Sequence, residues 1–210
     1  MTSVVRQMTV LPQFPLGLVL FPSMVLPLHV FEPRYRTMVH DVLDGERTFG
    51  VVMIERGSDV GGDDQRSDYG TAARVVEAEE LPDGRWALLT VGIERFRVVE
   101  WLPDDPYPLA EIESWPDSDP GIDEDDFGRV ESKFRRCVAL ASEAGFDTGP
   151  LPQALEPGEL GTMQMAAMLP IALLDKQKLL GIGGSCERLR AVEAAVDDTV
   201  ELIELQLREG

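Results

Sequence analysis

Residues of the types needed for covalent catalysis or metal binding are few and widely spaced in this chain. It contains two cysteines, Cys137 and Cys186, and two histidines, His29 and His40. The cysteines lack Cys-x-x-Cys spacing, and both histidines lie in or beside a proline-rich opening, far along the sequence from either thiol. We therefore expect two reduced, partly buried thiols, no catalytic residue, no metal site and no cofactor.

Two further patterns have the composition of ligand sites without the required spacing. The glycine-rich turn at 181–186 lacks the lysine of a Gly-x-x-x-x-Gly-Lys-Ser/Thr phosphate loop, and it is more typical of a break before a helix. Asp63, Asp64 and Asp68 offer oxygens to a divalent cation, but their spacing is not that of an EF-hand, so a solvated turn is the better interpretation. Neither pattern predicts an enzyme.

Non-covalent binding is best supported by a proline-rich stretch from Leu20 to Leu28, together with Phe31 and Tyr35. Prolines remove backbone donors and keep a chain extended, so its apolar side chains are either presented to a partner or form barrel core beside an irregular edge. Glu32 either contacts a partner, or favours the start of a helix and pairs with an arginine of the barrel. The candidate protein-binding residues are Phe21, Pro22, Met24, Pro27, Phe31, Glu32, Arg34 and Tyr35.

The elements that must position these residues begin with short apolar runs separated by prolines and glycines over residues 1–116. We expect a buried strand at 48–54 and strands at 73–79 and 85–91, joined by a tight hairpin in which Asp83 and Gly84 supply positive φ angles. A third run at 94–101 is expected to continue the meander. An amphipathic helix is expected at 33–44, capping one end of a barrel, and a polar loop at 57–68.

Beyond Trp115 the apolar spacing changes from about two residues to about 3.6. An acidic, proline-rich connector is expected at 117–126, followed by helices near 127–145, 157–168, 170–180 and 186–207. Met163, Met165 and Met168 suit either an adaptable binding surface or helix core. The predicted fold is α+β, with a β-barrel subdomain at 1–116 and a C-terminal α-helical bundle at 127–210.

The charge of the chain limits its partners. It has 38 acidic and 19 basic residues, a formal net charge of -19, and no local basic cluster, which argues against nucleic acid and anionic membrane. The N-terminus has no signal-peptide pattern, and no apolar run approaches the roughly 18 residues of a membrane span, so a cytoplasmic location is expected.

Several motifs resemble the Lon N-terminal domain family, tightly over residues 11–102 and more loosely afterwards. They are Leu11 to Leu16, Leu20 to Tyr35, Phe49 to Ile54, Tyr69 to Ala73, Gly92 to Arg97, Leu169-Pro170-Ile171 and Lys176 to Leu180. The resemblance implies a PUA-like pseudo-barrel with a helical extension, in a region that helps Lon proteases recognise substrates and assemble their ring. Unlike a full-length Lon protease, this sequence shows neither the phosphate loop of an ATPase nor a Ser-Lys protease dyad.

The function expected from the resemblance is a stand-alone module that binds proteins or peptides, including unfolded clients, without ATP hydrolysis or proteolysis. Self-association into a homo-oligomer is also expected, because the apolar helix faces need cover. Two alternatives stay open: an RNA- or small-ligand-binding PUA-like protein, since PUA-like barrels elsewhere bind RNA, and a peptidase, which would need a nucleophile and base that the sequence does not supply.

Overall fold

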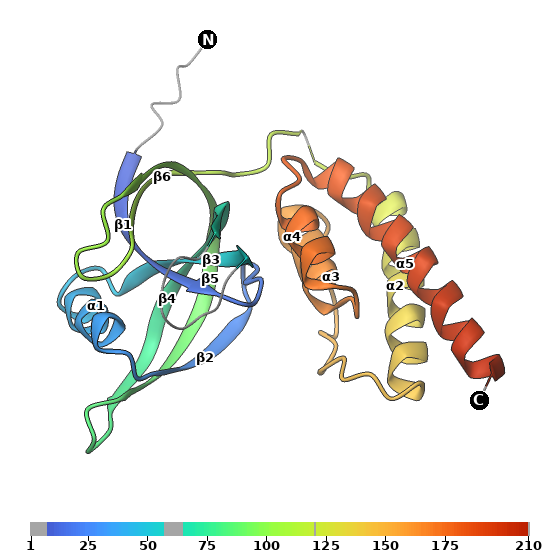
Figure 1. Ribbon diagram of the computed structural model, residues 1–210. Coiled ribbons are helices and arrows are strands. Elements are labelled where there is room, and N and C mark those ends of the chain that lie inside the picture. The colour runs from blue at the N-terminus through green and yellow to red at the C-terminus, as the bar shows by residue number, and fades with distance from the viewer. Residues whose placement is uncertain (1–7, 57–64, 120, 210) are drawn as a thin grey trace, which may run out of the picture. The chain divides into compact units, whose positions relative to one another are not determined.

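The computed structural model describes residues 8–56, 65–119 and 121–209, with side chains to residue 206. By its internal contacts the chain divides into two compact units, Met1–Pro116 and Asp117–Gly210 (Figure 1). The first is built mainly of strands and the second of helices, so the mixed α+β class predicted from the sequence is confirmed. No helix within the described ranges is both long and apolar enough to cross a membrane.

The strands of the first unit form a sheet that closes on itself. They are β1 (Met8–Leu16), β2 (Val25–Val30), β3 (Thr48–Arg56), β4 (Gln65–Glu80), β5 (Trp86–Leu102) and β6 (Leu109–Ser114). Their order is β2-β5-β4-β3-β1-β6, and an additional β5–β6 pairing completes a ring of five strands, with β2 attached to β5. β1 and β3 run parallel, and the other pairs are antiparallel.

β5 makes this closure possible because it is one long strand rather than the two that the sequence predicted. Its first half pairs with β2 and its second half with β6, and a register shift opposite β4 lies between Gly92 and Arg95. Gly92 is a point of close approach and not a turn, since a Cβ there would lie 2.3 Å from the carbonyl oxygen of Phe21. The bulge bends β5 so that one strand can serve two neighbours.

The hairpin between β4 and β5 is confirmed, but its turn differs from the prediction. The Gly84 amide donates to the carbonyl of Leu81 and the Leu81 amide to that of Arg85, both at 2.8 Å. Only Gly84 has a positive φ, of 77°. Pro82, whose ring fixes φ near -65°, suits the first central position of a type I turn, so the chain uses this turn followed by a left-handed glycine.

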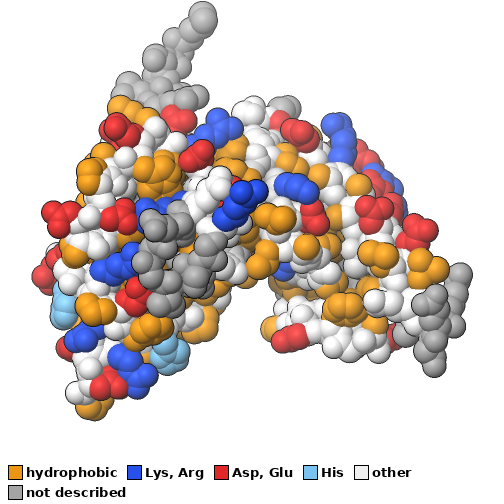
Figure 2. Space-filling view, in the orientation of Figure 1, with side chains coloured by type: hydrophobic (Ala, Val, Ile, Leu, Met, Phe, Trp, Pro, Cys, Tyr) orange, Lys and Arg blue, Asp and Glu red, His pale blue; other side chains and the backbone are white. Residues whose placement is uncertain are grey.

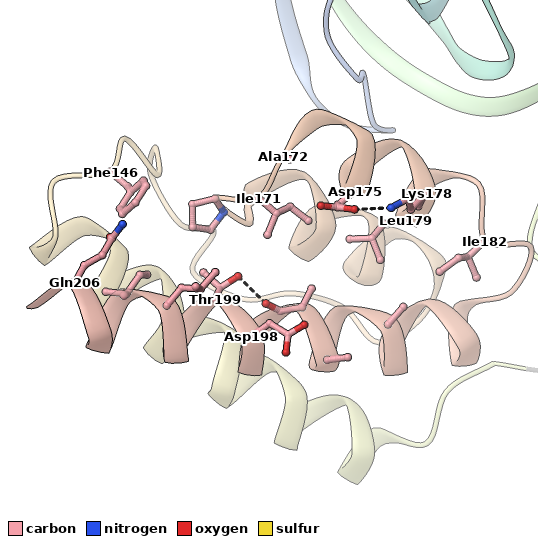
Figure 3. Close-up of a pocket in the computed structure, with 16 residues that line it drawn as sticks. Phe146, Ile171, Ala172, Asp175, Lys178, Leu179, Ile182, Asp198, Thr199 and Gln206 are labelled. Atoms are coloured by element: carbon pink, nitrogen blue, oxygen red, sulfur yellow. Dashed lines mark hydrogen bonds and ion pairs between the residues drawn. The ribbon is translucent and has the colours of Figure 1, made fainter. Parts of the chain in front are cut away.

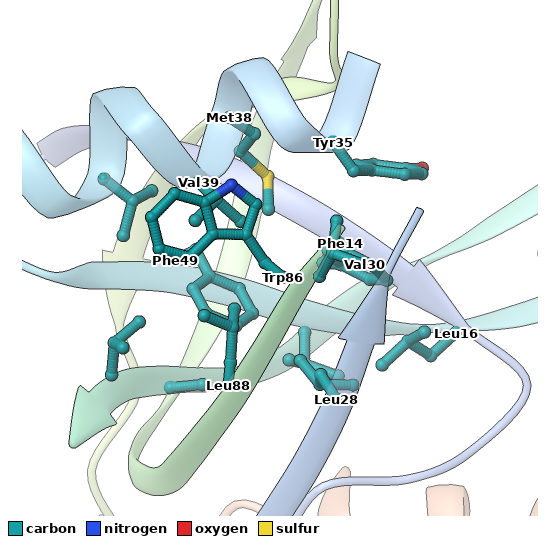
Figure 4. Packing of buried hydrophobic residues seen from close by; sticks show 14 of the residues in the cluster. Phe14, Leu16, Leu28, Val30, Tyr35, Met38, Val39, Phe49, Trp86 and Leu88 are labelled. Carbon is teal, nitrogen blue, oxygen red and sulfur yellow. The ribbon is translucent and has the colours of Figure 1, made fainter. Parts of the chain in front are cut away.

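α1 (Pro33–Asp44) has the bounds that the sequence predicted and covers an apolar cluster of the first unit (Figure 4). Its Tyr35, Met38, Val39 and Val42 are buried in one cluster with residues of β1, β2, β3 and β5. The ring of Tyr35 stacks on that of Phe14, with centroids 4.3 Å apart. The sequence pattern at 3.6-residue spacing therefore identified the buried face of this helix correctly.

The predicted loop at 57–68 is in part wrong. Residues 57–64, including Asp63 and Asp64, lie outside the described part of the chain. Gln65 to Asp68 already belong to β4, where Ser67 is buried. Their polar composition is typical of a loop, but pairing with β3 and β5 gives their backbone groups hydrogen-bond partners.

The second unit contains α2 (Glu124–Glu143), α3 (Glu159–Met168), α4 (Leu173–Leu180) and α5 (Ser185–Glu209). α2 lies along α5, and α3 contacts α2, α4 and α5. The apolar residues whose helical spacing predicted a helix here form the buried face of α2: Phe127, Val130, Phe134, Cys137, Val138 and Ala141. Met163 and Met165 are fully buried, which favours the helix-core interpretation.

α2 begins three residues before the predicted start, inside the expected connector. The Asp123 side chain accepts hydrogen bonds from the amides of Asp125 and Asp126, and three acidic residues occupy the first turn. Such a cap and such charges stabilise a helix N-terminus. The acid-rich composition that suggested a connector is thus in part a helix start.

Candidate functional site

An apolar groove of about 770 Å³ lies within the helical unit (Figure 3). α5 contributes its floor, through residues that recur every three or four positions: Ala191, Ala194, Ala195, Thr199, Leu202 and Ile203. Such spacing places side chains on one face of a helix. The side chains of the floor are therefore small where the alanines lie and larger toward Leu202, which is 63% exposed.

The opposite wall comes from α4 and the segment before it. Pro170, Ile171, Ala172 and Leu179 line the groove. Lys176 holds α4 against the end of α3, because its Nζ donates to the carbonyl oxygen of Ala167 at 2.6 Å. Burial of this ammonium lowers the pKa of Lys176.

Phe146 closes one end of the groove from the segment that follows α2. Gly145 has a φ of 90°, and the Phe146 amide donates to the carbonyl of Ala141 at 2.9 Å. This left-handed glycine ends the helix in the way usual for helix C-termini. The ring of Phe146 is consequently held at the groove and stays partly exposed.

The charged residues of the groove are Asp175, Lys178 and Asp198. Lys178 pairs with Asp175 at 2.8 Å, so these two charges offset each other. Asp198 has no hydrogen-bond or ion-pair partner among the side chains that the structure describes. The groove thus combines apolar surface with one uncompensated carboxylate, an arrangement suited to binding and not to covalent chemistry.

The eight residues that the sequence marked for protein binding do not form one surface. Phe21, Pro22 and Tyr35 are buried, so the core interpretation describes them better. Met24, Glu32 and Arg34 are partly buried, and Pro27 and Phe31 are exposed. Glu32 pairs with Arg34 at 3.2 Å, both at the start of α1, and among the described residues it pairs with no arginine of the barrel.

An exposed apolar strip does run over the outer face of β2 and β5. Val25 and Pro27 are exposed on β2, opposite Val91 and Leu89 of β5. Phe31, just after β2, is 54% exposed, which contradicts the alternative that placed it in the core. A shallow hollow of about 330 Å³ on this face includes Pro27 and Leu89.

The two cysteines have the environments of structural thiols. Cys137 is fully buried in α2, and burial raises the pKa of its thiol to about 11. Cys186 is a free, partly exposed cysteine whose Sγ donates to the carbonyl oxygen of Gly121 at 2.9 Å. A thiol nucleophile must ionise near neutral pH, so neither environment favours one. Within the described residues no three His, Cys, Asp or Glu side chains are grouped in a way that would hold a metal ion.

The sequence of this chain matches the family described as the ATP-dependent protease La (LON) substrate-binding domain over residues 10–197. The chain belongs to this family. The match includes most of both units and all of the groove except Asp198, Thr199, Leu202, Ile203 and Gln206. The resemblance stated from the sequence motifs is therefore confirmed.

Curated Lon proteases are similar to nearly the whole chain. The chain is 26% identical to a Lon protease of Cytophaga hutchinsonii over 212 aligned residues, which cover 94% of the chain and 25% of that protein. It is 32% identical to Lon protease 2 of Sorangium cellulosum over 197 residues, covering 90% of the chain and 24% of that protein. The chain thus spans about a quarter of the length of these relatives.

Solved structures of Lon N-terminal domains have the same fold. A Lon N-terminal domain protein from Xanthomonas campestris superposes with a TM-score of 0.68 at 27% identity, covering 89% of this chain and 98% of that one. The N-terminal domain of a Mycobacterium avium complex Lon protease gives a TM-score of 0.61 at 14% identity and covers 90% and 99%. At that identity the second structure supports the fold alone.

The groove of this Lon-family chain was missed by sequence reasoning, although two of its segments had been singled out. Leu169-Pro170-Ile171 and Lys176 to Leu180 were identified as family motifs, and Pro170, Ile171, Lys178 and Leu179 line the groove. The run of small residues on one face of α5 was the remaining signal. Neither pattern shows that the two segments face each other, because that depends on how the helices pack.

Proposed function

We propose that this member of the Lon substrate-binding family binds exposed apolar segments of other proteins, without ATP and without cleaving them. The observation that carries the proposal is the groove of about 770 Å³ between α4 and α5. Pockets of roughly 300–1,000 Å³ lined by apolar groups bury a ligand with several side chains. The family description, a substrate-binding domain, supports a role in recognition.

Binding by burial needs no nucleotide. Each Leu or Phe side chain that enters such a groove contributes about 1.5–3 kcal/mol, and lost motion of the partners offsets much of the sum. Three or four such side chains correspond to affinities in the micromolar range.

We also infer that the first unit is the PUA-like pseudo-barrel of the family, that the second is its helical bundle, and that the protein works in the cytoplasm.

Binding of one client in two forms tests the proposal. Native lysozyme and reduced, carbamidomethylated lysozyme carry nearly the same net charge, so attraction to the acidic chain alone would bind both equally. We expect the unfolded form to bind selectively in 150 mM salt without ATP, and to remain intact on gels. Equal binding of both forms, or cleavage of either, would contradict the proposal.

Variants of α5 connect binding to the groove. Leu202→Glu places a charge at the groove, whereas Leu205→Glu makes the same change on the same helix outside it. Both side chains are well exposed, 63% and 47%, so neither change disturbs the core. We expect Leu202→Glu alone to lower affinity for unfolded lysozyme at least ten-fold. If Phe31→Ser lowers it instead, the strip on β2 and β5 is the binding surface.

RNA binding is a second candidate function. Arg97 lies 3.6 Å from the ring centroid of Trp115, and Arg95 lies 4.8 Å from it, a pairing that also occurs in RNA-binding surfaces. Arg95 is buried, however, and on the face shown in Figure 2 the Lys and Arg side chains are scattered among acidic ones. With a net charge of -19, we expect no retention of single-stranded RNA on filters at any salt concentration.

A further inference from the structure

Asp198 is the one charged residue among the described side chains that α5 contributes to the groove. It follows Ala194 by four residues and precedes Leu202 by four, so it lies on the same side of α5 as these two groove-lining residues, and its side chain is exposed (Figure 3). An apolar segment that covered this carboxylate would remove its hydrating water without offering it a hydrogen bond or a positive charge. Such desolvation costs free energy unless the partner brings a cation.

The neighbouring charges leave Asp198 as the acid that a ligand would meet. Asp197, the residue before it, accepts hydrogen bonds from Lys133 at 2.9 and 3.0 Å. Glu193 pairs with Lys133 and Arg129. These pairs join α5 to α2. Asp198 lines the groove and has no such partner among the described side chains, so the charge pattern favours a ligand with a positive group at this point.

The shape of the floor indicates the conformation of the ligand. The stripe from Ala191 to Gln206 is about 22 Å long, or roughly four helical turns. Small residues on one helix let the backbone of another approach to about 8 Å, and their side chains interdigitate in ridges and grooves. A straight floor of this length fits a helix that lays its apolar face in the groove.

We propose that the ligand of the groove is an amphipathic helical segment of another protein, with Leu-type residues on one face and a Lys or Arg over Asp198. This inference rests on the proposed function and names the class of segment that the same site selects. A second copy of α5 is a poor occupant. It would bring the Asp198 of the second copy toward the same carboxylate, and like charges at an interface are repulsive.

The test uses alanine-based peptides of 18 residues, with leucine at every third or fourth position and fluorescein at the N-terminus. Three versions carry Arg, Gln or Glu at the centre of the leucine face. Fluorescence anisotropy in 150 mM salt measures their dissociation constants for the wild type, for Asp198→Asn, and for Glu201→Gln as a control. The control removes the same charge from the same helix, outside the groove.

The wild type is expected to bind the Arg peptide about three- to ten-fold more tightly than the Gln peptide, the range of a partly exposed ion pair, and the Glu peptide more weakly still. Asp198→Asn should abolish the difference between Arg and Gln, and Glu201→Gln should keep it. A difference that survives in Asp198→Asn, or that falls equally in both variants, would overturn the assignment of the cation to Asp198.

Two further measurements test whether the bound peptide is helical and whether the proposed binding of unfolded proteins holds without it. A proline at the centre of the Arg peptide prevents a continuous helix and should abolish binding, and unchanged binding would overturn the helical ligand. Binding of unfolded lysozyme without binding of any peptide would leave the proposed function intact and overturn this inference. Light scattering at the assay concentrations provides the last check: a dimer lost in Leu202→Glu would assign the groove to a second copy.

Discussion

Asp117 and Arg188 form a bidentate ion pair within the helical unit. Arg188 Nη2 donates to Oδ1 of Asp117 at 2.5 Å and Nη1 to Oδ2 at 2.9 Å. The Arg188 side chain is 0% exposed and that of Asp117 is 7% exposed. Arg188 also donates to Thr162 Oγ1 and to the carbonyl of Ile182. The first residue of this unit is thereby tied to α3, α5 and the turn between α4 and α5.

Removal of Asp117 should destabilise the helical unit strongly. Asp117→Ala leaves the Arg188 guanidinium buried without its counter-ion, a change that typically costs about 3–5 kcal/mol. Urea unfolding followed by circular dichroism measures the free energy of unfolding. Asp175→Ala, which breaks the exposed pair with Lys178, is the control and should change little. Equal effects of the two variants would refute a buried role for Asp117.

Asp119 should make the helical unit sensitive to acid. Hydrogen bonds from the Ser185 hydroxyl and the Cys186 amide hold the pKa of Asp119 below its usual 3.8. A carboxyl whose pKa is lower in the folded state contributes stability at pH values above 3.8 and loses it as the pH falls through the lowered value. The stability advantage of the wild type over Asp119→Asn should therefore be constant from pH 5 to 7 and shrink below pH 3.8. A difference that grows in acid would show the opposite sign.

Two helical glycines should respond in opposite ways to alanine. A Cβ at Gly161 would lie 2.2 Å from the carbonyl oxygen of Glu156 and 2.7 Å from the Phe127 ring, so Gly161→Ala should cost about 2–3 kcal/mol. A Cβ at Gly128, in the second turn of α2, meets no atom within 4 Å. Gly128→Ala should raise stability by about 0.5–1 kcal/mol. Thermal unfolding of the two variants measures their melting temperatures relative to the wild type. Shifts of the same sign would contradict the close packing at Gly161.

The two thiols should react at very different rates. Cys137 is buried and its pKa is raised to about 11, so about one thiol in a thousand is ionised at pH 8. Desolvation, and then Asp119, also raise the pKa of Cys186, but this thiol is partly exposed. Iodoacetamide at pH 8 should modify Cys186 slowly and Cys137 only in urea, as read by mass spectrometry of peptides. Native labelling of Cys137 at the same rate would contradict its burial.

Local periodicity located the helices and three of the strands, β3, β4 and β5. The bounds of α1, the buried stripe of α2 and the buried strand β3 all followed from the spacing of apolar residues and from Pro33. The predictions were wrong where a residue type that suggests a local break serves a contact between distant segments instead. The two strands predicted at 85–91 and 94–101 are one strand, in which Gly92 allows the backbone of Phe21 to approach the bend.

The sequence by itself determined the class of fold, the positions of most helices and strands, the family and the acidic character of the chain, because these depend on residue type and local spacing. Tertiary structure decided which apolar residues are exposed. Tyr35 is buried and Phe31 is exposed although both lie in one apolar stretch, because α1 packs the first against Phe14. The groove, too, exists only when α4 packs beside α5 and Phe146 closes its end, and no single segment encodes that packing.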